Sequence, residues 1–373
     1  MPVRILFFIE ELSGGGAEKV LCNLVNHMDQ SKFDITVQTL WKADAKQFLH
    51  PGIHYRYCYA RKNRLNEYCS RLAAAAGLTY PLYIRDNFDI EVAYLEFGAT
   101  KIMSRSTSKT AKKLAWVHSD LAQKLSESPD ILDKAKKQYG AFDKVVCVSW
   151  TAKDSFDRLF GHIKDSVVLY NTIDDTAIRA RAELLPVDFP EKRRLTVLAA
   201  GRLAPEKQYD LLLRTHRRLL GEGLLHDLWI AGEGSERAKL ETLIAENHLE
   251  DSVRLLGFRS NPYPYMAAAD LLACSSKYEG FSSFIAEGLI LGKPIVTTEC
   301  SGMRELLGDS EYGLITENSE NGFYNGLKQM LANTSLRERF SELACVRGEA
   351  FSAAQLANQT ERFFLNILED QSL

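Results

Sequence analysis

Short runs of apolar residues alternate along the chain with segments of helical periodicity. Val, Ile and Leu dominate these runs, which is typical of strands buried on both faces of a parallel sheet. In the first half, strands are predicted at 3–9, 34–40, 90–95, 113–117, 144–148 and 166–170, and helices near 17–29, 64–85, 129–140 and 150–160. This half is therefore expected to form a parallel sheet covered by helices.

The pattern is interrupted at residues 181–194 and then starts again. The interruption is charged and contains Pro186 and Pro190, which suits a linker between domains. Beyond it, strands are predicted at 195–201, 227–231, 252–256, 270–274, 294–298 and 312–315, with helices near 207–220, 235–247, 282–291 and 319–332. We predict two doubly wound α/β domains facing a cleft, in which ligands bind beyond the carboxyl ends of strands.

Composition and charge exclude several classes of protein. A chain of 373 residues can hold two ordinary domains, and its formal net charge of −3 does not indicate a nucleic-acid partner. The seven cysteines form no Cys-x-x-Cys pair, which favours a reducing compartment and argues against structural zinc. The apolar run at the N-terminus is too short for a signal peptide, and no run approaches the length of a membrane span. We therefore expect a cytoplasmic protein, at most peripheral to a membrane.

Residues 55–85 combine basic and aromatic side chains. The basic residues are Arg56, Arg61, Lys62, Arg64, Arg71 and Arg85, and the tyrosines among them are Tyr55, Tyr57, Tyr59, Tyr68, Tyr80 and Tyr83. This combination suits the anionic face of a membrane or a phosphate-linked acceptor. A solvated charged surface explains the same residues equally well.

In the second half, two cations flank the turn after the first strand. Arg202 follows Gly201, and Lys207 stands five residues later at the start of the next predicted helix. A guanidinium fork and an ammonium group at a strand-to-helix turn are what a bound diphosphate requires. Surface charges at a helix start are common, so this motif alone is moderately specific.

Two carboxylates lie eight positions apart in the segment from Lys277 to Leu289. Glu279 follows an apolar run, and Ser282 and Ser283 can cap a helix that contains Glu287. The amide groups at such a helix start attract anions. Glu279 can then face a reacting group while Glu287 reaches a hydroxyl-bearing part of the same ligand, although a surface helix with two unrelated acids is the simpler reading.

Three further loops after predicted strands are candidates for ligand contact. The glycine run that includes Gly15 and Gly16 opens a helix but lacks the pattern of a nicotinamide site or a P-loop. His118 can hydrogen-bond a sugar or phosphate oxygen, although a lone histidine is more often structural. Phe258 lies in a loop that can line a nucleobase pocket. Simple turn geometry remains an alternative for the glycine run.

Together these motifs resemble glycosyltransferase family 4, whose members are retaining, nucleotide-sugar-dependent enzymes of the GT-B fold. The resemblance covers nearly the whole chain and is strongest from Leu195 to about Ile315. It rests on Gly201-Arg202 with Lys207, on Glu279-Gly-Phe followed by Glu287, on the Gly-Gly-x-Glu that ends at Glu18, and on Asn171. Gln208 and Ser282 depart from the common pattern at positions that tolerate such changes.

The resemblance implies a role for each matching residue. Catalytic residues would be Glu279, His118, Arg202 and Lys207, and donor-binding residues would be Gly15, Gly16, Asn171, Arg202, Lys207, Phe258, Ser283, Phe284 and Glu287. Arg202 and Lys207 would bind the diphosphate and Glu287 the ribose hydroxyls, with no metal and no cofactor beyond the nucleotide-sugar donor. Residues 1–180 would form the acceptor-side domain, to which a helix at about 352–373 returns, and 195–351 the donor-binding domain.

We therefore expect a retaining transferase that moves a hexose or N-acetylhexosamine from a nucleotide sugar to a glycan or lipid-linked acceptor in surface-polysaccharide synthesis, and the expected donor is UDP-linked. Two alternatives remain open. One is a UDP-sugar epimerase of the same architecture, which needs no acceptor. The other is a non-catalytic GT-B subunit that supports a partner transferase. The presence of Arg202, Lys207, Glu279 and Glu287 argues against this second alternative.

Overall fold

The computed structural model describes residues 1–12, 16–45, 48–119, 121–122, 129–161, 163–279 and 281–369. The chain divides into two compact units. The first unit comprises residues 1–173 and 353–373, and the second comprises residues 174–352. Each unit is a Rossmann-like α/β domain built on one parallel sheet, so the two-domain α/β fold predicted from the sequence is confirmed.

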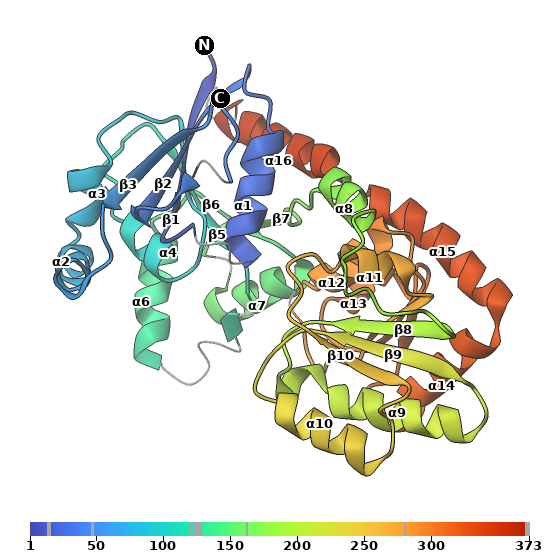
Figure 1. Cartoon of the computed structure of the whole chain (residues 1–373). Coiled ribbons are helices and arrows are strands. Elements are labelled where there is room, and N and C mark those ends of the chain that lie inside the picture. The colour runs from blue at the N-terminus through green and yellow to red at the C-terminus, as the bar shows by residue number, and fades with distance from the viewer. Residues whose placement is uncertain are drawn as a thin grey trace. The chain divides into compact units, whose positions relative to one another are not determined.

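The first domain holds a sheet of seven strands in the order β3-β2-β1-β4-β5-β6-β7 (Figure 1). Its elements are β1 (Val3–Ile9), α1 (Gly16–His27), β2 (Phe33–Trp41), β3 (His54–Tyr59), α2 (Arg64–Ala75), α3 (Thr79–Tyr83), β4 (Ile90–Ala93), α4 (Gly98–Met103), β5 (Lys112–Val117), α6 (Pro129–Tyr139), β6 (Lys144–Cys147), α7 (Trp150–Phe160), β7 (Asp165–Val168) and α16 (Ala353–Glu369). Every neighbouring pair of strands is parallel.

The second domain holds six parallel strands in the order β10-β9-β8-β11-β12-β13. Its elements are α8 (Asp175–Ala182), β8 (Leu195–Ala200), the 3₁₀ helix η2 (Pro205–Lys207), α9 (Tyr209–Gly221), β9 (His226–Ala231), α10 (Arg237–Glu246), β10 (Val253–Gly257), α11 (Tyr263–Ala268), β11 (Leu271–Cys274), α12 (Ser283–Ile290), β12 (Ile295–Thr298), α13 (Met303–Leu307), β13 (Leu314–Thr316), α14 (Glu320–Ala332) and α15 (Thr334–Glu349).

The last helix, α16, completes the core of the first domain. Its Phe364 is fully buried, and its ring lies 6.0 Å from that of Phe7 on β1 and 6.4 Å from that of Trp116 on β5. The carboxylate of Glu361 accepts a 2.7 Å hydrogen bond from the amide of Asp29, which follows α1. The apolar face of α16 thus packs against the sheet of the first domain.

The order of the strands creates one topological switch point in each sheet. Successive connections run outward from β1 on one side and from β4 on the other, and the same change of direction occurs between β8 and β11. At such a point the loops that follow the two central strands diverge and leave a crevice, which is where open α/β sheets bind ligands. We therefore expect the ligand-binding site of each domain to lie at its switch point.

Several elements differ from those predicted from the sequence. The predicted helix at 64–85 is two helices, because Gly77 adopts a φ of +73° that ends α2. Helix α8 ends at Ala182 and so includes the first two residues of the segment interpreted as a linker, and the two compact units divide at residue 174. Strand β3 was missed because its sequence, His-Tyr-Arg-Tyr-Cys-Tyr, contains no run of Val, Ile or Leu, which an edge strand does not require.

Two compositional expectations can be compared with the structure. All seven cysteines are free thiols in this structure. Over the ranges described above, no helix is both long enough and apolar enough to cross a lipid bilayer.

Two buried histidines form a hydrogen-bonded chain in the second domain. His216 on α9 is 1% exposed, and its Nδ1 lies 2.8 Å from Nε2 of His226 on β9. Ser252 Oγ lies 2.9 Å from the other ring nitrogen of His216, and Nδ1 of His226 lies 2.8 Å from the carbonyl of Leu224. Burial, and then the neighbouring His226, lower the pKa of His216 to about 3, and burial also lowers the pKa of His226. Both rings are therefore neutral at pH 7.

This histidine pair predicts that the second domain loses stability in mild acid. The unfolded chain takes up a proton at each histidine below pH about 6.5, whereas the folded chain does not, so the free energy of unfolding falls as the pH decreases from about 6.5 toward 3. The slope per histidine is at most about 1.4 kcal/mol per pH unit. Denaturant unfolding between pH 4.5 and 7.5 should show a shallower pH dependence in His216→Gln than in the wild type.

The exposed His248 provides the control, because it lies outside the buried chain. His248→Asn should retain the pH dependence of the wild type, since asparagine tolerates the positive φ of this position. Equal slopes in all three proteins would show that the buried pair does not govern the acid sensitivity.

Candidate functional site

The switch point of the second sheet gathers most of the charged residues singled out in the sequence. Strand β8 ends at Ala200 and leads into the turn that carries Arg202 and Lys207. Strand β11 ends at Cys274 and leads into the loop that carries Glu279. Because β8 and β11 are adjacent and parallel, both loops emerge at the same edge of the sheet.

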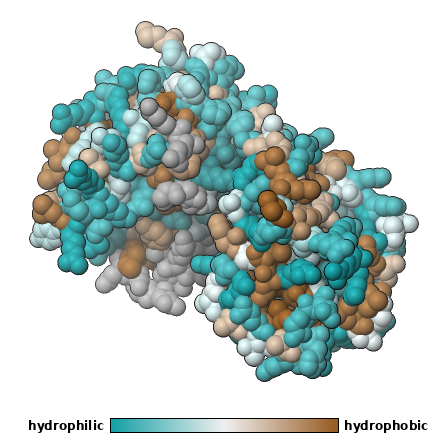
Figure 2. Space-filling model, in the orientation of Figure 1, coloured by the Kyte–Doolittle hydropathy of each residue, from teal (hydrophilic) through white to brown (hydrophobic). Residues whose placement is uncertain are grey.

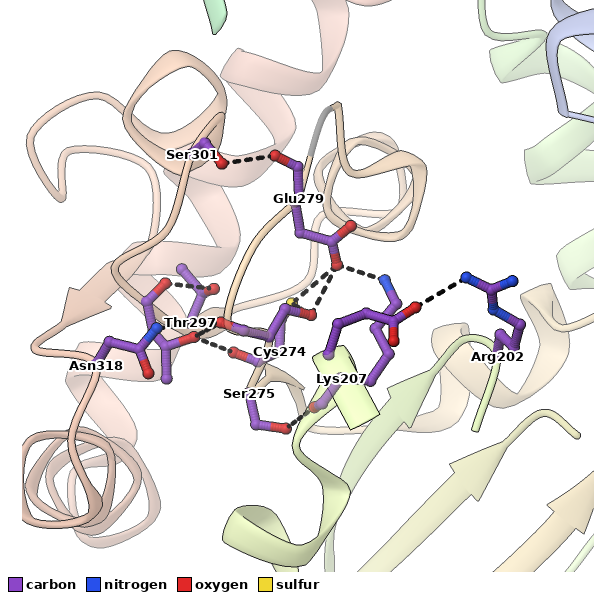
Figure 3. Close-up of polar contacts among 11 residues, drawn as sticks. Arg202, Lys207, Cys274, Ser275, Glu279, Thr297, Ser301 and Asn318 are labelled. Atoms are coloured by element: carbon purple, nitrogen blue, oxygen red, sulfur yellow. Dashed lines mark hydrogen bonds and ion pairs between the residues drawn. The ribbon is translucent and has the colours of Figure 1, made fainter. Parts of the chain in front are cut away.

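An ion pair connects the two loops. Lys207 Nζ lies 2.5 Å from Glu279 Oε1, and the two side chains are 22% and 12% exposed (Figure 3). Ser276 donates a 2.7 Å hydrogen bond to the same carboxylate oxygen, and the thiol of Cys274 lies 3.8 Å from it. Burial, and then the nearby Glu279, raise the pKa of Cys274, so that side chain is a neutral thiol. The lysine therefore has one close, partly desolvated anionic partner.

Hydrogen bonds to backbone carbonyls hold the two loops in position. Ser275 Oγ donates to the carbonyl of Lys207 at 2.7 Å, and the amide of Lys277 donates to the carbonyl of Glu206 at 2.8 Å. On the far side, the hydroxyl of Ser301 donates to the carbonyl of Glu279 at 2.8 Å. Figure 3 shows the bonds of Ser275 and Ser301 around the ion pair. These hydrogen bonds fix the backbones of the two loops, so the positions of Lys207 and Glu279 do not depend on their mutual attraction alone.

The turn after β8 also requires glycine. Gly201 has a φ of +153° and Gly232, after the neighbouring β9, has a φ of +151°. A side chain at Gly232 would overlap the carbonyl oxygen of Gly201. The two turns therefore pass each other at backbone contact, which brings the start of the Arg202 loop close to the end of the next strand.

Arg202 lies differently from Lys207. Its side chain is 74% exposed, and its Nη2 donates a 2.8 Å hydrogen bond to Glu206, four residues later in the same turn. Such an exposed pair contributes little to stability and exchanges partners readily. The sequence prediction that Arg202 and Lys207 flank one turn is met, but only Lys207 is held in place by the neighbouring loop.

Helix α12 supplies the remaining residues predicted in this domain. Ser282 is its N-cap residue, but the side chain of Ser282 makes no cap hydrogen bond, contrary to the capping role expected from the sequence. Phe284, in the first turn, lines a small cavity together with Lys207 and Glu279. Ser283 is exposed. The first turn of α12 thus lies beside the ion pair.

Glu287 stands one turn further along α12 and faces α11. The hydroxyl of Tyr263 donates to Glu287 Oε1 at 3.1 Å, and the guanidinium of Arg181 lies 5.1 Å from the centre of the Tyr263 ring. Burial, followed by the Glu287 charge, raises the pKa of Tyr263 above its usual value. The phenol is therefore protonated and positions the carboxylate. Phe258, by contrast, is 75% exposed after β10.

In the first domain, His118 follows β5 and is fixed by a carboxylate that the sequence reading overlooked. Its amide donates to Glu96 Oε2 at 3.1 Å, and its ring centre lies 4.9 Å from that of Tyr94. Ser119 also donates to Glu96. Burial alone would raise the pKa of Glu96, but the bonds from Ser119 and the His118 amide outweigh it, and the pKa is lowered. Glu96 is thus a buried anion that holds the backbone at His118.

The other residues predicted in the first domain have diverse surroundings. Gly16 is exposed at the first position of α1, and Gly15 lies outside the described residues. Asn171 follows β7, and its Oδ1 is buried without a hydrogen-bond partner among the described residues. An amide oxygen in that state is available to a donor group of a ligand.

Tyr263, Ser276 and Glu96 are the site residues that reasoning from the sequence missed. Glu96 follows an apolar strand, the same signal that singled out Glu279, and could have been found in that way. Tyr263 could not, because it belongs to a short helix between β10 and β11 that has no periodic pattern.

A protein-family model matches most of the second domain. Residues 182–345 match the family described as "Glycosyl transferases group 1". This region contains Arg202, Lys207, Glu279 and Glu287, and it nearly coincides with the second structural unit.

Two curated relatives are glycosyltransferases by name. The chain is 38% identical over 204 residues to the N-acetylgalactosamine-N,N'-diacetylbacillosaminyl-diphospho-undecaprenol 4-alpha-N-acetylgalactosaminyltransferase of Campylobacter jejuni, and the alignment covers 54% of each protein. It is 23% identical over 346 residues to the amylovoran biosynthesis glycosyltransferase AmsD of Erwinia amylovora, covering 91% of this chain and 93% of AmsD. The chain thus spans about half the length of the Campylobacter relative.

Among solved structures, Anabaena HepE in complex with UDP superimposes with a TM-score of 0.78 at 20% identity, over 98% of this chain and all of HepE. HepE has also been solved with UDP-glucose. At this identity the likeness concerns the fold, which is the GT-B arrangement of two Rossmann-like domains in one chain. The chain thus has the GT-B fold, and its residues 182–345 are similar to the glycosyl transferases group 1 family.

Proposed function

We propose that the protein is a retaining glycosyltransferase that transfers a hexose or N-acetylhexosamine from a UDP-sugar. The observation that carries the proposal is the Lys207–Glu279 pair at the switch point of a glycosyltransferase group 1 domain. The exposed guanidinium of Arg202 lies on the same turn, and the first turn of α12 borders the same cavity. A cation, a guanidinium and helix-start amides together suit the diphosphate of a nucleotide sugar.

In this proposal Lys207 changes partners when the donor binds. The approaching diphosphate competes with Glu279 for the ammonium group, and Arg202 turns from Glu206 to the phosphates. As the sugar–oxygen bond breaks, charge develops on the leaving phosphate, and these cations stabilise it without a metal ion. Glu279, released from the lysine, then accepts hydrogen bonds from the transferred sugar, while Glu287 accepts them from the ribose.

His118, Gly16 and Asn171 would act from the first domain. The buried Glu96 anion fixes the backbone at His118, so that the carbonyl of this residue can face the positive charge that develops on the sugar. Retention of configuration, with the leaving phosphate taking the proton of the acceptor, is part of the proposal. The name of the Campylobacter relative, which specifies an α linkage, supports it if the donor is an α-linked nucleotide sugar.

For the acceptor we propose a lipid-linked oligosaccharide in surface-polysaccharide synthesis, met at the cytoplasmic face of the membrane. Both curated relatives act in the assembly of glycans by name, and one name specifies an undecaprenyl diphosphate acceptor. Helix α2 exposes an apolar stripe of Leu65, Tyr68 and Leu72, which are 70%, 62% and 52% exposed. Basic residues flank the stripe, and Figure 2 shows apolar and polar side chains mixed over α2 and α3 at the left of the view. An amphipathic surface of this kind suits an anionic bilayer.

The donor is tested by thermal unfolding in the presence of nucleotides and EDTA. We expect UDP and one UDP-sugar to stabilise the protein, by roughly 2.7 kcal/mol at a concentration of 100 times the dissociation constant. A flat response to every nucleotide would contradict the proposal. Release of free sugar epimer and UDP from the donor alone would indicate an epimerase instead, and inversion of the anomeric configuration in the product would refute retention.

Loss of either the Lys207 or the Glu287 charge should strongly reduce transfer. Lys207→Ala removes the stabilisation of the leaving diphosphate, for which we expect a fall in kcat of about 10²–10³-fold. Glu287→Ala removes the contact to the ribose and should also eliminate measurable turnover. The exposed Lys239, on α10, gives the matched control Lys239→Ala, which should transfer at the wild-type rate.

Folding of these variants is checked by circular dichroism and thermal unfolding. Because Lys207→Ala leaves Glu279 partly buried without its cation, a moderate loss of stability is expected together with the loss of activity. Transfer at the wild-type rate by folded Lys207→Ala and Glu287→Ala proteins would remove the basis for the site assignment.

Cosedimentation with vesicles tests the membrane surface. Replacing Arg61 and Arg64 together with Leu65 by serine should weaken binding to anionic vesicles at least several-fold, and binding by the wild type should decrease with salt. The control replaces Arg217 and Leu225 of the second domain, both exposed, by serine. Equal binding by both variants would leave the basic residues as an ordinary solvated surface.

A further inference from the structure

A second cavity opens at the switch point of the first sheet. Glu10 directly follows β1, and Gly98 begins α4 after β4, so both lie where the loops of the two central strands diverge. The cavity has a volume of about 380 Å³, within the usual range of small-ligand sites. Its polar lining includes Glu10, Glu11, Lys62, Glu67, Arg71 and Lys101. None of these residues has a role in the proposed donor site.

The Glu10 carboxylate is held rigidly at the base of this cavity. The amide of Gly98 donates to it, and a side chain at position 98 would overlap it. The carbonyl of Glu10 accepts hydrogen bonds from the amides of Leu40 and Trp41, at 3.1 and 3.2 Å, where β2 ends. Phe97, just before Gly98, has a φ of +66°, a strained conformation that the surrounding structure must maintain. The position of this carboxylate is therefore determined by three strands.

The charges around the cavity balance. Glu11 and Lys62 form an ion pair across its rim. Over the described part of the chain, neither Arg71 nor Lys101 has an ion-pair partner, so both can donate to a ligand. Glu10 can accept hydrogen bonds. A diphosphate would meet the Glu10 and Glu11 carboxylates at close range and be repelled, whereas a neutral ring with hydroxyl or acetamido groups uses both the donors and the acceptors.

We propose that this cavity binds a neutral sugar ring, the hexose or N-acetylhexosamine of the acceptor that receives the transferred sugar. The assignment rests on the proposed transferase function and gives the acceptor a subsite. The carboxylate of Glu10 accepts from the ring hydroxyls, and Arg71 and Lys101 donate to its oxygens. The apolar part of the wall, formed by Trp41, Ala74 and Ile102, covers the less polar face of the ring.

Helix α2 links this cavity to the surface proposed to contact the membrane. Glu67, Ser70, Arg71 and Ala74 line the cavity from one side of the helix. Leu65, Tyr68 and Leu72 are exposed on other positions of the same helix. One helix thus borders both the sugar site and the apolar stripe, as an acceptor with a sugar head and a lipid tail requires.

The test measures binding of simple glycosides to the full chain by ligand-observed NMR. The probes are the methyl α-glycosides of glucose, galactose, N-acetylglucosamine and N-acetylgalactosamine, with inorganic pyrophosphate as the anionic competitor. We expect at least one glycoside to bind, and Glu10→Gln to weaken its binding about tenfold, since a charge-assisted hydrogen bond is lost. Asp165→Asn, at an exposed carboxylate of the same domain, should bind as the wild type does.

Stabilisation by UDP confirms that each variant is folded and keeps its donor site. Because the readout is glycoside binding, it is independent of whether transfer from any donor is detected; once transfer is detected, Glu10→Gln should raise the KM for the acceptor and leave UDP affinity unchanged. Three results would overturn the inference: no glycoside binds, Glu10→Gln binds as tightly as the wild type, or pyrophosphate displaces the glycoside in the wild type but not in Arg71→Ala.

Discussion

The ion pair between Lys207 and Glu279 is the interaction around which the second domain's site is organised. Each group offsets part of the desolvation cost of the other, because both side chains are mostly buried and their charged atoms lie 2.5 Å apart. Their proximity requires that β8 and β11 be adjacent and that both loops leave the sheet at the same edge. The pair is thus a consequence of strand order as much as of the two residues themselves.

A pair of this kind prepares a site for an anion. Lys207 is held in place before any ligand arrives, so a diphosphate does not have to immobilise a flexible side chain. The serines around the pair bind backbone carbonyls as well as the carboxylate, so the loops keep their positions when the lysine changes partner. Arg202, in contrast, lies in solvent, and ordering it on binding has a cost in side-chain entropy.

The same constraint acts in the first domain with a different outcome. Its switch point lies between β1 and β4, and the cavity there is lined by Glu10 together with other acidic and basic side chains. The amide of Gly98 donates a hydrogen bond to the Glu10 carboxylate. Glu96, in the loop that follows β4, accepts a hydrogen bond from the backbone amide of His118. One sheet geometry therefore presents cations to a ligand in one domain, and both hydrogen-bond acceptors and donors in the other.

The sequence by itself determined the two parallel sheets, the repeated alternation of strands and helices, and the loops that carry Lys207, Glu279 and Glu287. These follow from local patterns, since buried strands need continuous apolar runs and turns beside ligands need glycine or charge. The tertiary structure alone decided which loops meet. It joined Lys207 to Glu279, exposed Phe258, gave Glu287 a phenol from α11, and brought Glu10 against Gly98. These contacts join residues far apart in sequence, and the order of strands that creates them depends on packing over the whole sheet.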